Sequence, residues 1–592
     1  MDIQEQVKTD IQQAIQALFG ITIEDVALQP TKKEFEGLYT FVTFPLTKAL
    51  RQAPAQIGQA IGTWLVTNSS IISSFNVVQG FLNINIADVA WVRALNDIAT
   101  NPAFGTLPAN GQSVMVEFSS PNTNKPLHLG HLRNNFLGDS VSRILTANGY
   151  DVVKTCIVND RGVHICKSML AYQMFATDAS GRAETPESSG MKGDHLIGKY
   201  YVLFDKAYKA QVDQMVSQGT PKEEAEKKAP LMQEVQQMLR LWEQGDPETV
   251  ALWRKLNDWV YAGFDATYRS IGVSFDKTYY ESNTYLLGKE VVEEGLEKGI
   301  FYRKDDGSVW IDLTEEGLDH KLVLRSDGTS VYMTQDLGTT DLKFQDFHND
   351  RQIWVVGNEQ DYHFAVLFAI LRRLGRPYAN QLFHLSYGMV DLPTGKMKSR
   401  EGTVVDADDL IQETTDAAST AADEAAKGKL DEFSESEKTA LFQMLGLGAL
   451  KYYLLKVDPQ KRMQFNPAES VDLHGNTGPY IQYVHARIQS VLRKAADMGV
   501  AISGEIPGGT LDEIEQQLIF LLSQYPQRVA EAGTDLAPSY IGQYAYELAK
   551  TFNQFYDKLS ILKETDAVKL QTRLVLSKAI GETIRKAMGL LG

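Results

Sequence analysis

Cysteine and long apolar runs are nearly absent from this chain. Only Cys156 and Cys166 occur among 592 residues, and their spacing fits neither a CxxC motif nor a metal site, which indicates a reducing compartment and no structural zinc. No apolar run approaches the roughly 18 residues of a membrane span, and the amphipathic N-terminal segment has no cleavable signal pattern. We therefore expect a cytoplasmic protein that does not enter a membrane.

The chain also lacks an excess of basic residues. It has 58 Lys and Arg against 75 Asp and Glu, which gives a formal net charge of −17. This balance argues against non-specific binding to nucleic acid, because such binding depends on neutralising phosphates. It does not exclude a specific large substrate, since cations can cluster locally. The length and the 43% hydrophobic content predict three or four domains.

A short apolar strand pattern at 114–118 is followed by His128-Leu129-Gly130-His131 at the start of an amphipathic helical pattern. Two imidazoles at positions i and i+3 point the same way, beside backbone N–H groups that a helix N-terminus leaves unpaired. This arrangement suits the phosphates of a nucleotide. Because Gly130 has no Cβ, a flat adenine has room to lie against the backbone there.

A basic segment, Lys396-Met397-Lys398-Ser399-Arg400, lies between Gly395 and Gly402. By composition alone it is a basic surface turn. The flanking glycines would also allow it to close over a phosphate group.

Six blocks of the sequence together resemble one family. His128–His131 is similar to the HIGH motif of class I aminoacyl-tRNA synthetases, and the surrounding residues resemble those of arginyl-tRNA synthetases. The lysine segment stands at the position of the KMSKS motif. The blocks are GFLN (80–83), EFSSPNTNKPLHLGHLRNN (117–135), KLVLRSDGTSVYMTQDLG (321–338), VVGNEQDYHF (355–364), GMVDLPTGKMKSREG (388–402) and GNTGPYIQYVHARI (475–488).

The expected fold is a multidomain α/β protein. Its catalytic domain is a doubly wound parallel sheet that binds a nucleotide and carries an insertion, preceded by an α+β domain and followed by an all-α helical bundle. The clearest further strands of the nucleotide fold are 152–158, 309–313 and 353–357. The expected boundaries are 1–110 for the N-terminal domain that touches the tRNA corner, 111–175 and 261–387 for the two catalytic halves, 176–260 for the connective insertion, 388–437 for the lysine loop and linker, and 438–592 for the anticodon-binding bundle.

The resemblance implies an arginine–tRNA ligase. Arginine and ATP, with Mg²⁺ as part of the ATP substrate, would give arginyl-adenylate, and the 3′-terminal adenosine of tRNA(Arg) would then accept the arginyl group. The resemblance further implies attachment first at the 2′-OH, activation that requires bound tRNA, and a monomer. It implies no tightly bound cofactor and no metal site.

For catalysis the resemblance selects His128, His131, Lys396 and Lys398, and for ATP binding His128, Gly130, His131, Lys396, Gly388 and Met389. The sequence departs from the motif at Ser399, where a second lysine is expected. Lys125, three residues before His128, is our hypothesis for the compensating positive charge. His363 is a weaker candidate for contact with the ATP base, because an isolated histidine beside Phe364 more often belongs to the core.

The resemblance places Glu281, Asp336 and Tyr332 around the arginine guanidinium. Glu117, Asn122 and Gln360 would surround the amino-acid end of the substrate. A guanidinium is planar and always charged, so its pocket requires carboxylates. Tyr332 and Asp336 share a face if a helix begins there, although Asp336 alone is equally compatible with a helix cap or a surface acid.

Two groups of residues are candidates for tRNA binding. On the strand pattern 81–86, Phe81, Asn83 and Asn85 alternate and therefore face one side, where they would meet an unstacked base; the alternative is that Phe81 is core. In the C-terminal bundle the resemblance selects Tyr480, Arg487 and Tyr556 for the anticodon. The alternative there is ordinary packing of the tyrosines.

Two other functions remain open at this point. A class I synthetase for another amino acid would share the histidine motif and the bundle, but would not need Asp336, Glu281 and Tyr332 together. A non-catalytic, synthetase-like RNA-binding protein would be compatible with Ser399, although the intact histidines argue against it.

Overall fold

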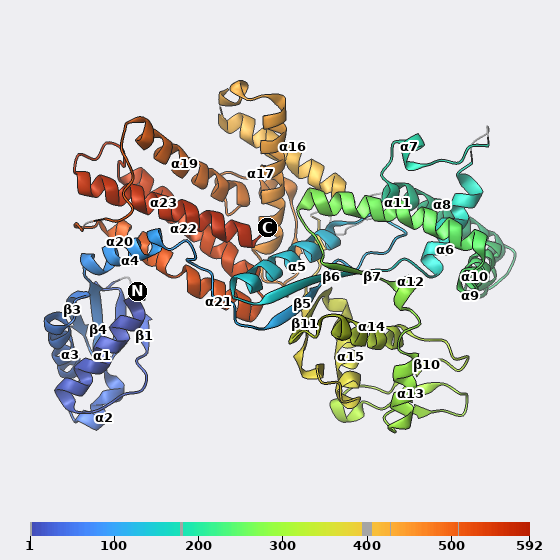
Figure 1. The fold of residues 1–592 in the computed structure, drawn as a ribbon, viewed down its shortest axis with the longest axis horizontal. Helices are drawn as coiled ribbons and strands as arrows, with labels where there is room; N and C mark the ends of the chain where they lie inside the picture. Colours follow the sequence, from blue (N-terminus) through green and yellow to red (C-terminus); the bar gives the residue numbers. More distant parts are fainter. Residues whose placement is uncertain (1–2, 33, 178–180, 393–404, 427, 507) are drawn as a thin grey trace. The chain divides into compact units, whose positions relative to one another are not determined.

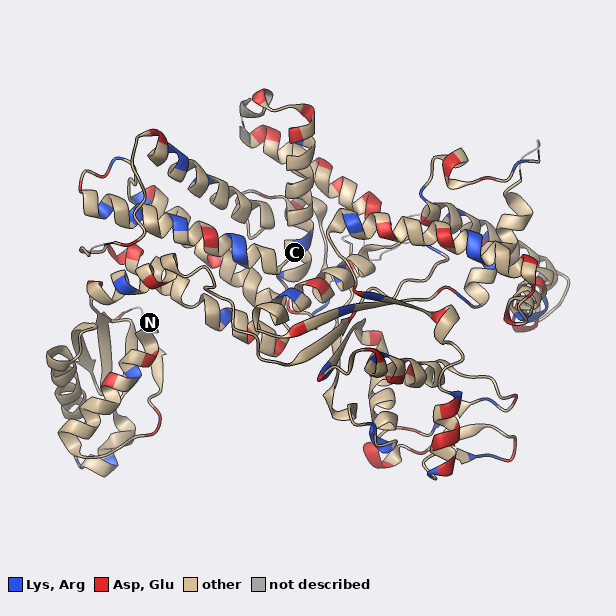
Figure 2. Ribbon diagram, in the orientation of Figure 1, with Lys and Arg blue, Asp and Glu red and all other residues tan. Residues whose placement is uncertain are grey.

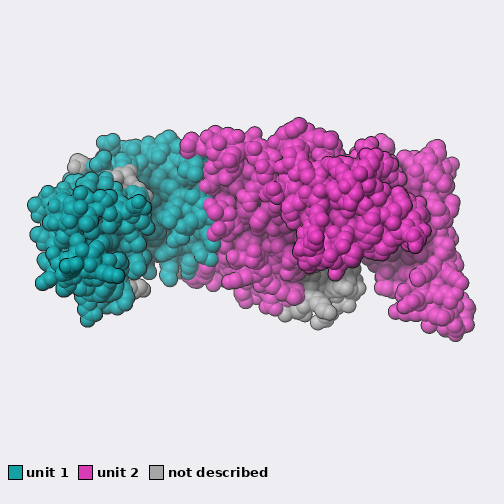
Figure 3. Space-filling model, turned by 90° about the horizontal axis from the view of Figure 1, so that it is seen from below, with its two compact units in different colours: residues 1–107, 480–531, 540–589 teal, residues 108–479, 532–539, 590–592 magenta. Residues whose placement is uncertain are grey.

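The computed structural model describes residues 3–32, 34–177, 181–392, 405–426, 428–506 and 508–592. The chain forms two compact units, which Figure 3 distinguishes by colour. One unit consists of Met1–Leu107, Tyr480–Glu531 and Tyr540–Gly589, and the other of Pro108–Pro479, Ala532–Ser539 and Leu590–Gly592. Each unit therefore combines segments that are distant in the sequence.

A five-stranded parallel sheet is the centre of the second unit (Figure 1). Its order is β12-β11-β5-β6-β7, and every neighbouring pair is parallel. The chain first adds β6 and β7 on one side of β5 and then β11 and β12 on the other, so the strand order reverses between β5 and β11. Doubly wound folds bind ligands at this point, beside the carboxyl ends of the strands. The predicted doubly wound sheet is thus confirmed. The strands are β5 (Ser113–Glu117), β6 (Asp151–Val158), β7 (Lys277–Tyr280), β11 (Arg351–Gly357) and β12 (Leu382–Tyr387).

Helices connect these strands and pack against them. Met115 and Val116 of β5 and Ile353 of β11 are fully buried, as expected for parallel strands that are covered on both faces. In the helix that follows the histidine motif, α5, a Cβ at Gly138 would lie 2.2 Å from the ring of Phe118. Only glycine therefore allows this helix to approach the end of β5 so closely. The helices are α5 (Leu129–Ala147), α6 (Val163–Phe175), α14 (Tyr332–Phe347) and α15 (Asp361–Arg373).

The prediction that 309–313 contributes to the parallel sheet is wrong. Strand β9 (Val309–Ile311) lies instead in a three-stranded antiparallel sheet, between β8 (Tyr302–Arg303) and β10 (Lys321–Leu324). The short connection between β8 and β9 explains the difference, because a parallel pair needs a crossover of about a dozen residues or more. Two short helices precede this sheet, α12 (Glu281–Thr284) and α13 (Lys289–Glu297).

The segment expected to interrupt the nucleotide fold is helical. Its last helix, α11 (Pro247–Ile271), continues beyond residue 260 and leads to β7. The earlier helices are α7 (Pro186–Ser189), α8 (Gly193–Ser217), α9 (Lys222–Lys228) and α10 (Pro230–Glu243).

The segment that follows the parallel sheet is mostly helical. Strand β13 (Val390–Asp391) pairs in parallel with β14 (Met463–Gln464), which brings two segments about 70 residues apart in sequence together. The helices of this region are α16 (Ala407–Ala426), α17 (Glu435–Leu455) and α18 (Pro467–Ser470).

The first unit contains an α+β region and a helical region; both regions were predicted, but not their combination in one compact unit. Its antiparallel sheet has the order β1-β2-β4-β3 and consists of β1 (Leu28–Pro30), β2 (Tyr39–Val42), β3 (Ile72–Val78) and β4 (Phe81–Ile86). Its N-terminal helices are α1 (Ile3–Phe19), α2 (Thr47–Leu50), α3 (Pro54–Asn68) and α4 (Asp88–Thr100). The helical region contains α19 (Gly478–Asp497), α20 (Glu513–Ser523), α21 (Tyr525–Asp535), α22 (Pro538–Lys558) and α23 (Ala567–Leu590).

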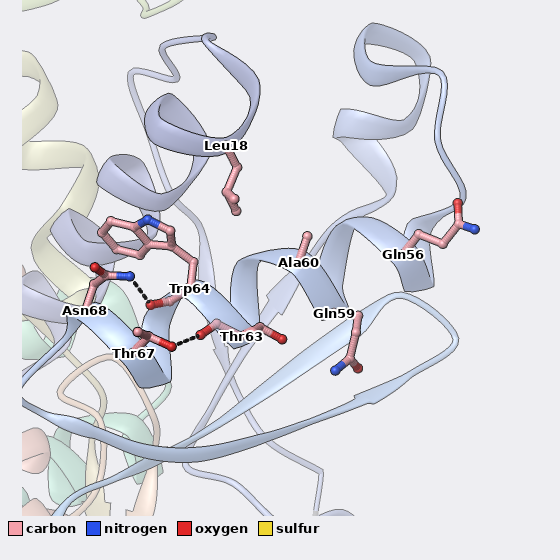
Figure 4. Close-up of a pocket in the computed structure, with 8 residues that line it drawn as sticks. All are labelled: Leu18, Gln56, Gln59, Ala60, Thr63, Trp64, Thr67 and Asn68. Atoms are coloured by element: carbon pink, nitrogen blue, oxygen red, sulfur yellow. Dashed lines mark hydrogen bonds between the residues drawn. The ribbon is translucent and has the colours of Figure 1, made fainter.

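A hollow of about 590 Å³ lies between the end of α1 and α3 (Figure 4). Leu18 and Trp64 provide apolar surface. The hydrogen bonds drawn there, from Asn68 to the Trp64 carbonyl and from Thr67 to the Thr63 carbonyl, stay within α3. None of the predicted site residues that the structure describes lines this hollow.

Acidic and basic side chains are interspersed over most helices (Figure 2). Helix α16 differs, because its sequence ADDLIQETTDAASTAADEAA contains no Lys or Arg. Among the described residues, no helix has the length and apolar character that a membrane crossing requires.

Candidate active site

His128 and His131 cap the N-terminus of α5. The backbone N–H of Gly130 donates to Nδ1 of His128 at 3.1 Å, and the backbone N–H of His128 donates to Nδ1 of His131 at 3.1 Å. The two ring centroids are 3.9 Å apart. Because Nδ1 accepts in both rings, each neutral imidazole carries its proton on Nε2 and has that N–H available for another partner.

The surroundings keep both rings neutral. Burial lowers the pKa of His128 to about 4, and the charge of Lys125 contributes to this shift. Burial also holds the pKa of His131 well below its usual value, with smaller contributions from His128 and Lys125. Lys125 is half-buried, and burial lowers its own pKa. At neutral pH the site therefore presents two neutral Nε2–H donors with a lysine beside them.

The backbone N–H groups of this helix end are less available than the sequence suggested. Gly130 donates to His128, and Leu129 donates to the carbonyl of Val405 at 3.3 Å. Since Ala407 also donates to the carbonyl of Leu127 at 2.9 Å, the chain that follows the lysine loop pairs with the histidine motif. Of the groups expected to donate to phosphate oxygens, the imidazoles are therefore better candidates than these two backbone N–H groups.

Lys125 and His128 line a cavity of about 810 Å³, together with residues of α8 and with Val405 and Asp406. The predicted lysine-loop residues, Lys396 and Lys398, lie outside the described residues, as does Ser399.

Gly388 and Met389 are fixed by the chain around Pro459. The N–H of Gly388 donates to the carbonyl of Pro459 at 2.9 Å, and the N–H of Met463 donates to the carbonyl of Met389 at 3.1 Å. The N–H of Gly388 is therefore not available to adenine, whereas the carbonyl of Met389 has a second lone pair and can accept another hydrogen bond. A Cβ at Gly388 would lie 2.5 Å from the backbone nitrogen of Arg462, so the close approach requires glycine.

Arg133 holds the same segment and was not predicted. Its side chain is fully buried, and Nη2 donates to the carbonyls of Pro459 and Lys461 at 3.0 Å each. Burial lowers its pKa to about 10. Since a buried cation must be compensated by polar partners, these carbonyls hold the helix of the histidine motif against the segment that positions Gly388. No pattern in the sequence distinguishes Arg133 from a surface arginine.

A carboxylate cluster forms where β6 and β7 end. Glu281 directly follows β7, and burial raises its pKa to about 7; the charges of Asp160 and Asp336 add to the increase, and that of Arg161 opposes it. Asp160 is fully buried and accepts hydrogen bonds from the N–H and hydroxyl of Ser282, at 2.8 and 2.7 Å. Asp160 was not selected from the sequence, although a carboxylate just after an apolar strand is a pattern that indicates a ligand site.

Asp336 and Tyr332 lie on the first turns of α14, as their spacing predicted. Tyr332 is 75% exposed. Oδ2 of Asp336 lies 2.6 Å from Nε2 of His363, at the start of α15. His363 therefore contacts a predicted arginine ligand, which differs from the core role that its apolar neighbour suggested.

The three residues expected at the amino-acid end of the substrate lie at the end of β5 and in the segments that follow β5 and β11. Glu117 is buried, and its Oε2 lies 2.5 Å from Nζ of Lys343. That carboxylate is thus already paired in this structure. Asn122 and Gln360 are exposed, and Asn122 forms a backbone bridge with Asn159.

Tyr480, Arg487 and Tyr556 lie close together on α19 and α22. The amide of Asn553 donates to the Tyr480 hydroxyl at 2.9 Å and accepts from Arg487 at 2.5 Å. The Arg487 guanidinium lies 4.9 Å from the ring centroid of Tyr556 and equally far from that of Tyr483. The two rings are partly exposed. Asn553 and Tyr483 complete this cluster and were not predicted.

On β4 the three predicted tRNA residues differ in exposure. Phe81 and Asn85 are partly exposed, whereas Asn83 is 1% exposed. The Asn83 amide accepts from Thr40 at 2.6 Å and donates to Asn76 at 2.7 Å. Asn83 is thus buried and hydrogen-bonded within the sheet, so a contact with a base would require its surroundings to rearrange.

Three families match successive parts of the chain. The family described as arginyl tRNA synthetase N terminal domain matches residues 5–86, and tRNA synthetases class I (R), catalytic domain, matches residues 98–466. The DALR anticodon binding domain matches residues 481–592.

Relatives match this chain over its full length. The chain is 54% identical to the arginine–tRNA ligases of Amoebophilus asiaticus and Bacteroides thetaiotaomicron, over 100% of this chain and 99% of each relative. The structure of arginyl-tRNA synthetase from Thermus thermophilus is similar, with a TM-score of 0.76 at 24% identity, over 100% of this chain and 98% of that one. The chain therefore belongs to the arginyl-tRNA synthetases, the class I family of arginine–tRNA ligases.

Proposed function

We propose that this protein activates L-arginine with ATP and transfers the arginyl group to the 3′-terminal adenosine of tRNA(Arg). The observation that carries the proposal is the collection of two kinds of groups at the carboxyl ends of one parallel sheet. Neutral imidazole donors follow β5, and the carboxylates Glu281 and Asp336 lie after β7 and on α14. The former suit phosphate oxygens and the latter a guanidinium.

In the first step the arginine carboxylate attacks the α-phosphorus of ATP, and pyrophosphate leaves. The barrier falls through positioning of the reactants and stabilisation of charge on the phosphate oxygens. The Nε2–H groups of His128 and His131 donate to these oxygens, and Lys125, whose charge acts on both rings, supplies positive charge. Mg²⁺ enters as part of the ATP substrate, and we assign no tightly bound cofactor.

Arginine is selected through its guanidinium. Asp336 and Glu281 accept its N–H groups, and Tyr332 packs on it. Glu117, Asn122 and Gln360 are assigned to the amino-acid end; the ion pair of Glu117 with Lys343 supports an indirect role, in which Glu117 orients its neighbours. Each charge-assisted hydrogen bond contributes roughly 1.5–3 kcal/mol, so a neutral analogue would be rejected by tens to hundreds of fold.

The tRNA would be recognised through local surfaces, which fits the acidic net charge. The cluster of Tyr480, Arg487 and Tyr556 offers aromatic rings and a guanidinium to anticodon bases. Phe81 and Asn85 would contact the tRNA corner. We further propose that the protein acts in the cytoplasm as a monomer.

The proposed reaction is tested by arginine-dependent exchange of pyrophosphate into ATP, with and without deacylated total tRNA. We expect exchange with arginine, and only when tRNA is present. Exchange with a different amino acid would show that the protein is a class I synthetase for that amino acid. No exchange by folded protein under any condition would favour a non-catalytic role.

Lys125→Ala is expected to slow adenylate formation. Loss of one charge-assisted contact to the phosphates, at roughly 1.5–3 kcal/mol, corresponds to a decrease of about ten- to a hundredfold. Single-turnover formation of arginyl-adenylate measures this rate directly. Lys209→Ala, in the same cavity but on α8 and paired with Asp205, is the matched control and should retain the wild-type rate. An unchanged rate in Lys125→Ala would rule out the compensation for Ser399.

The affinity for arginine should depend on pH through Glu281. Its pKa of about 7 in the free protein means that the carboxylate that would bind the guanidinium is partly protonated at neutral pH and becomes fully ionised as the pH rises. The KM for arginine should therefore fall roughly tenfold between pH 6 and pH 8. In Glu281→Gln the KM should be high and independent of pH over this range. A constant KM in the wild type would contradict the assigned pKa or the assigned role.

A further inference from the structure

The contact between His363 and Asp336 joins two helices at the predicted guanidinium site. Nε2 of His363 lies 2.6 Å from Oδ2 of Asp336. A carboxylate oxygen that carries no proton only accepts hydrogen bonds, so Nε2 carries the hydrogen and donates it. His363 lies on the first turn of α15, after the carboxyl end of β11, and Asp336 lies on α14. The pair thus fixes one carboxylate from a neighbouring element.

A partner such as His363 restricts the rotamers of Asp336, whose side chain is 41% exposed. An exposed carboxylate rotates between several rotamers, and its ordering costs conformational entropy when a ligand binds. The His363 side chain is less exposed, at 28%, and its ring meets that of Phe364 edge to face, with 5.9 Å between centroids. Phe364 belongs to the core of the domain. The histidine is therefore less exposed than the carboxylate that it contacts, and its ring packs against a residue of the core.

The hydrogen bond also makes the two carboxylate oxygens of Asp336 different from each other. His363 occupies Oδ2, which leaves Oδ1 for a ligand. Asp336 lies near enough to Glu281 for its charge to raise the pKa of that residue, so both carboxylates act on the same region. A guanidinium presents several N–H donors in a rigid plane and can satisfy Oδ1 of Asp336 and the Glu281 carboxylate together.

We propose that His363 is a positioning residue for the arginine site, which orders Asp336 in the free protein so that one carboxylate oxygen faces the guanidinium. The inference rests on the proposed function, because it takes Asp336 as a guanidinium ligand. It predicts an effect on arginine binding and not on ATP binding. If His363 instead contacted the ATP base, the effect would be on ATP.

The test compares His363→Ala and His363→Gln with Asp336→Asn in pyrophosphate exchange in the presence of tRNA. We expect His363→Ala to raise the KM for arginine about tenfold, while the KM for ATP stays unchanged and kcat stays within about twofold. His363→Gln should restore most of the affinity, because its amide N–H can donate to Oδ2. His320→Gln, an exposed histidine of the same unit that contacts Tyr302, is the matched control and should behave as the wild type.

The thermal midpoint of each variant separates binding from folding, and a merely structural role for His363 would lower kcat and the midpoint and change both KM values. In the background of Asp336→Asn, His363→Ala should add no further increase in the KM for arginine, as expected for two residues that act as a unit.

If Asp336→Asn raises this KM but His363→Ala does not, the inference is overturned and the proposed pocket survives. If Asp336→Asn has no effect, the proposed pocket itself is wrong. An increase confined to the KM for ATP would overturn the inference in favour of contact with the base.

Discussion

The N-terminal cap of α5 is the interaction on which the proposed chemistry depends. Two histidines use Nδ1 to satisfy backbone N–H groups at the start of the helix, so one set of hydrogen bonds both begins the helix and fixes the two rings. Burial and the nearby Lys125 keep the rings neutral. Each ring then presents an N–H donor that needs no protonation, and the donors are ordered before ATP binds. Such preorganisation is what makes electrostatic stabilisation effective.

The parallel sheet brings the remaining groups to one edge. Glu117 ends one strand, and Asp160, Glu281 and Gln360 follow three others; together they span more than 240 positions of the sequence. Arg133 connects this edge to the segment around Pro459, which in turn holds Gly388. The site is therefore a consequence of the strand order, which reverses between β5 and β11. The acidic net charge is compatible with this arrangement, because the groups proposed to contact tRNA are few and local.

The sequence predicted the parts of this structure that local patterns determine. Strands β5, β6 and β11 were recognisable because buried parallel strands are continuous apolar runs. The strands that pair with β9 were not recognisable, because an apolar pattern does not specify which strands lie beside the one that carries it. Likewise, alternation placed Asn83 on one face of β4 but did not predict that Thr40 and Asn76 of the neighbouring strands would bind its amide. Arg133 and the contact between His363 and Asp336 depend on tertiary packing, which has no local signature, whereas Asp160 stands at a strand end and was recognisable.

The tautomers and charge of His128 and His131 test the account most directly. A long-range ¹H–¹⁵N spectrum of protein labelled in its 10 histidines, with resonances assigned through His128→Gln and His131→Gln, reports which ring nitrogen carries the proton. We predict that both rings are neutral and protonated on Nε2 at pH 7, and that His128 becomes charged only near pH 4. A proton on Nδ1, or an imidazolium at pH 7, would contradict the cap geometry and the neutral donors on which the proposed mechanism is built.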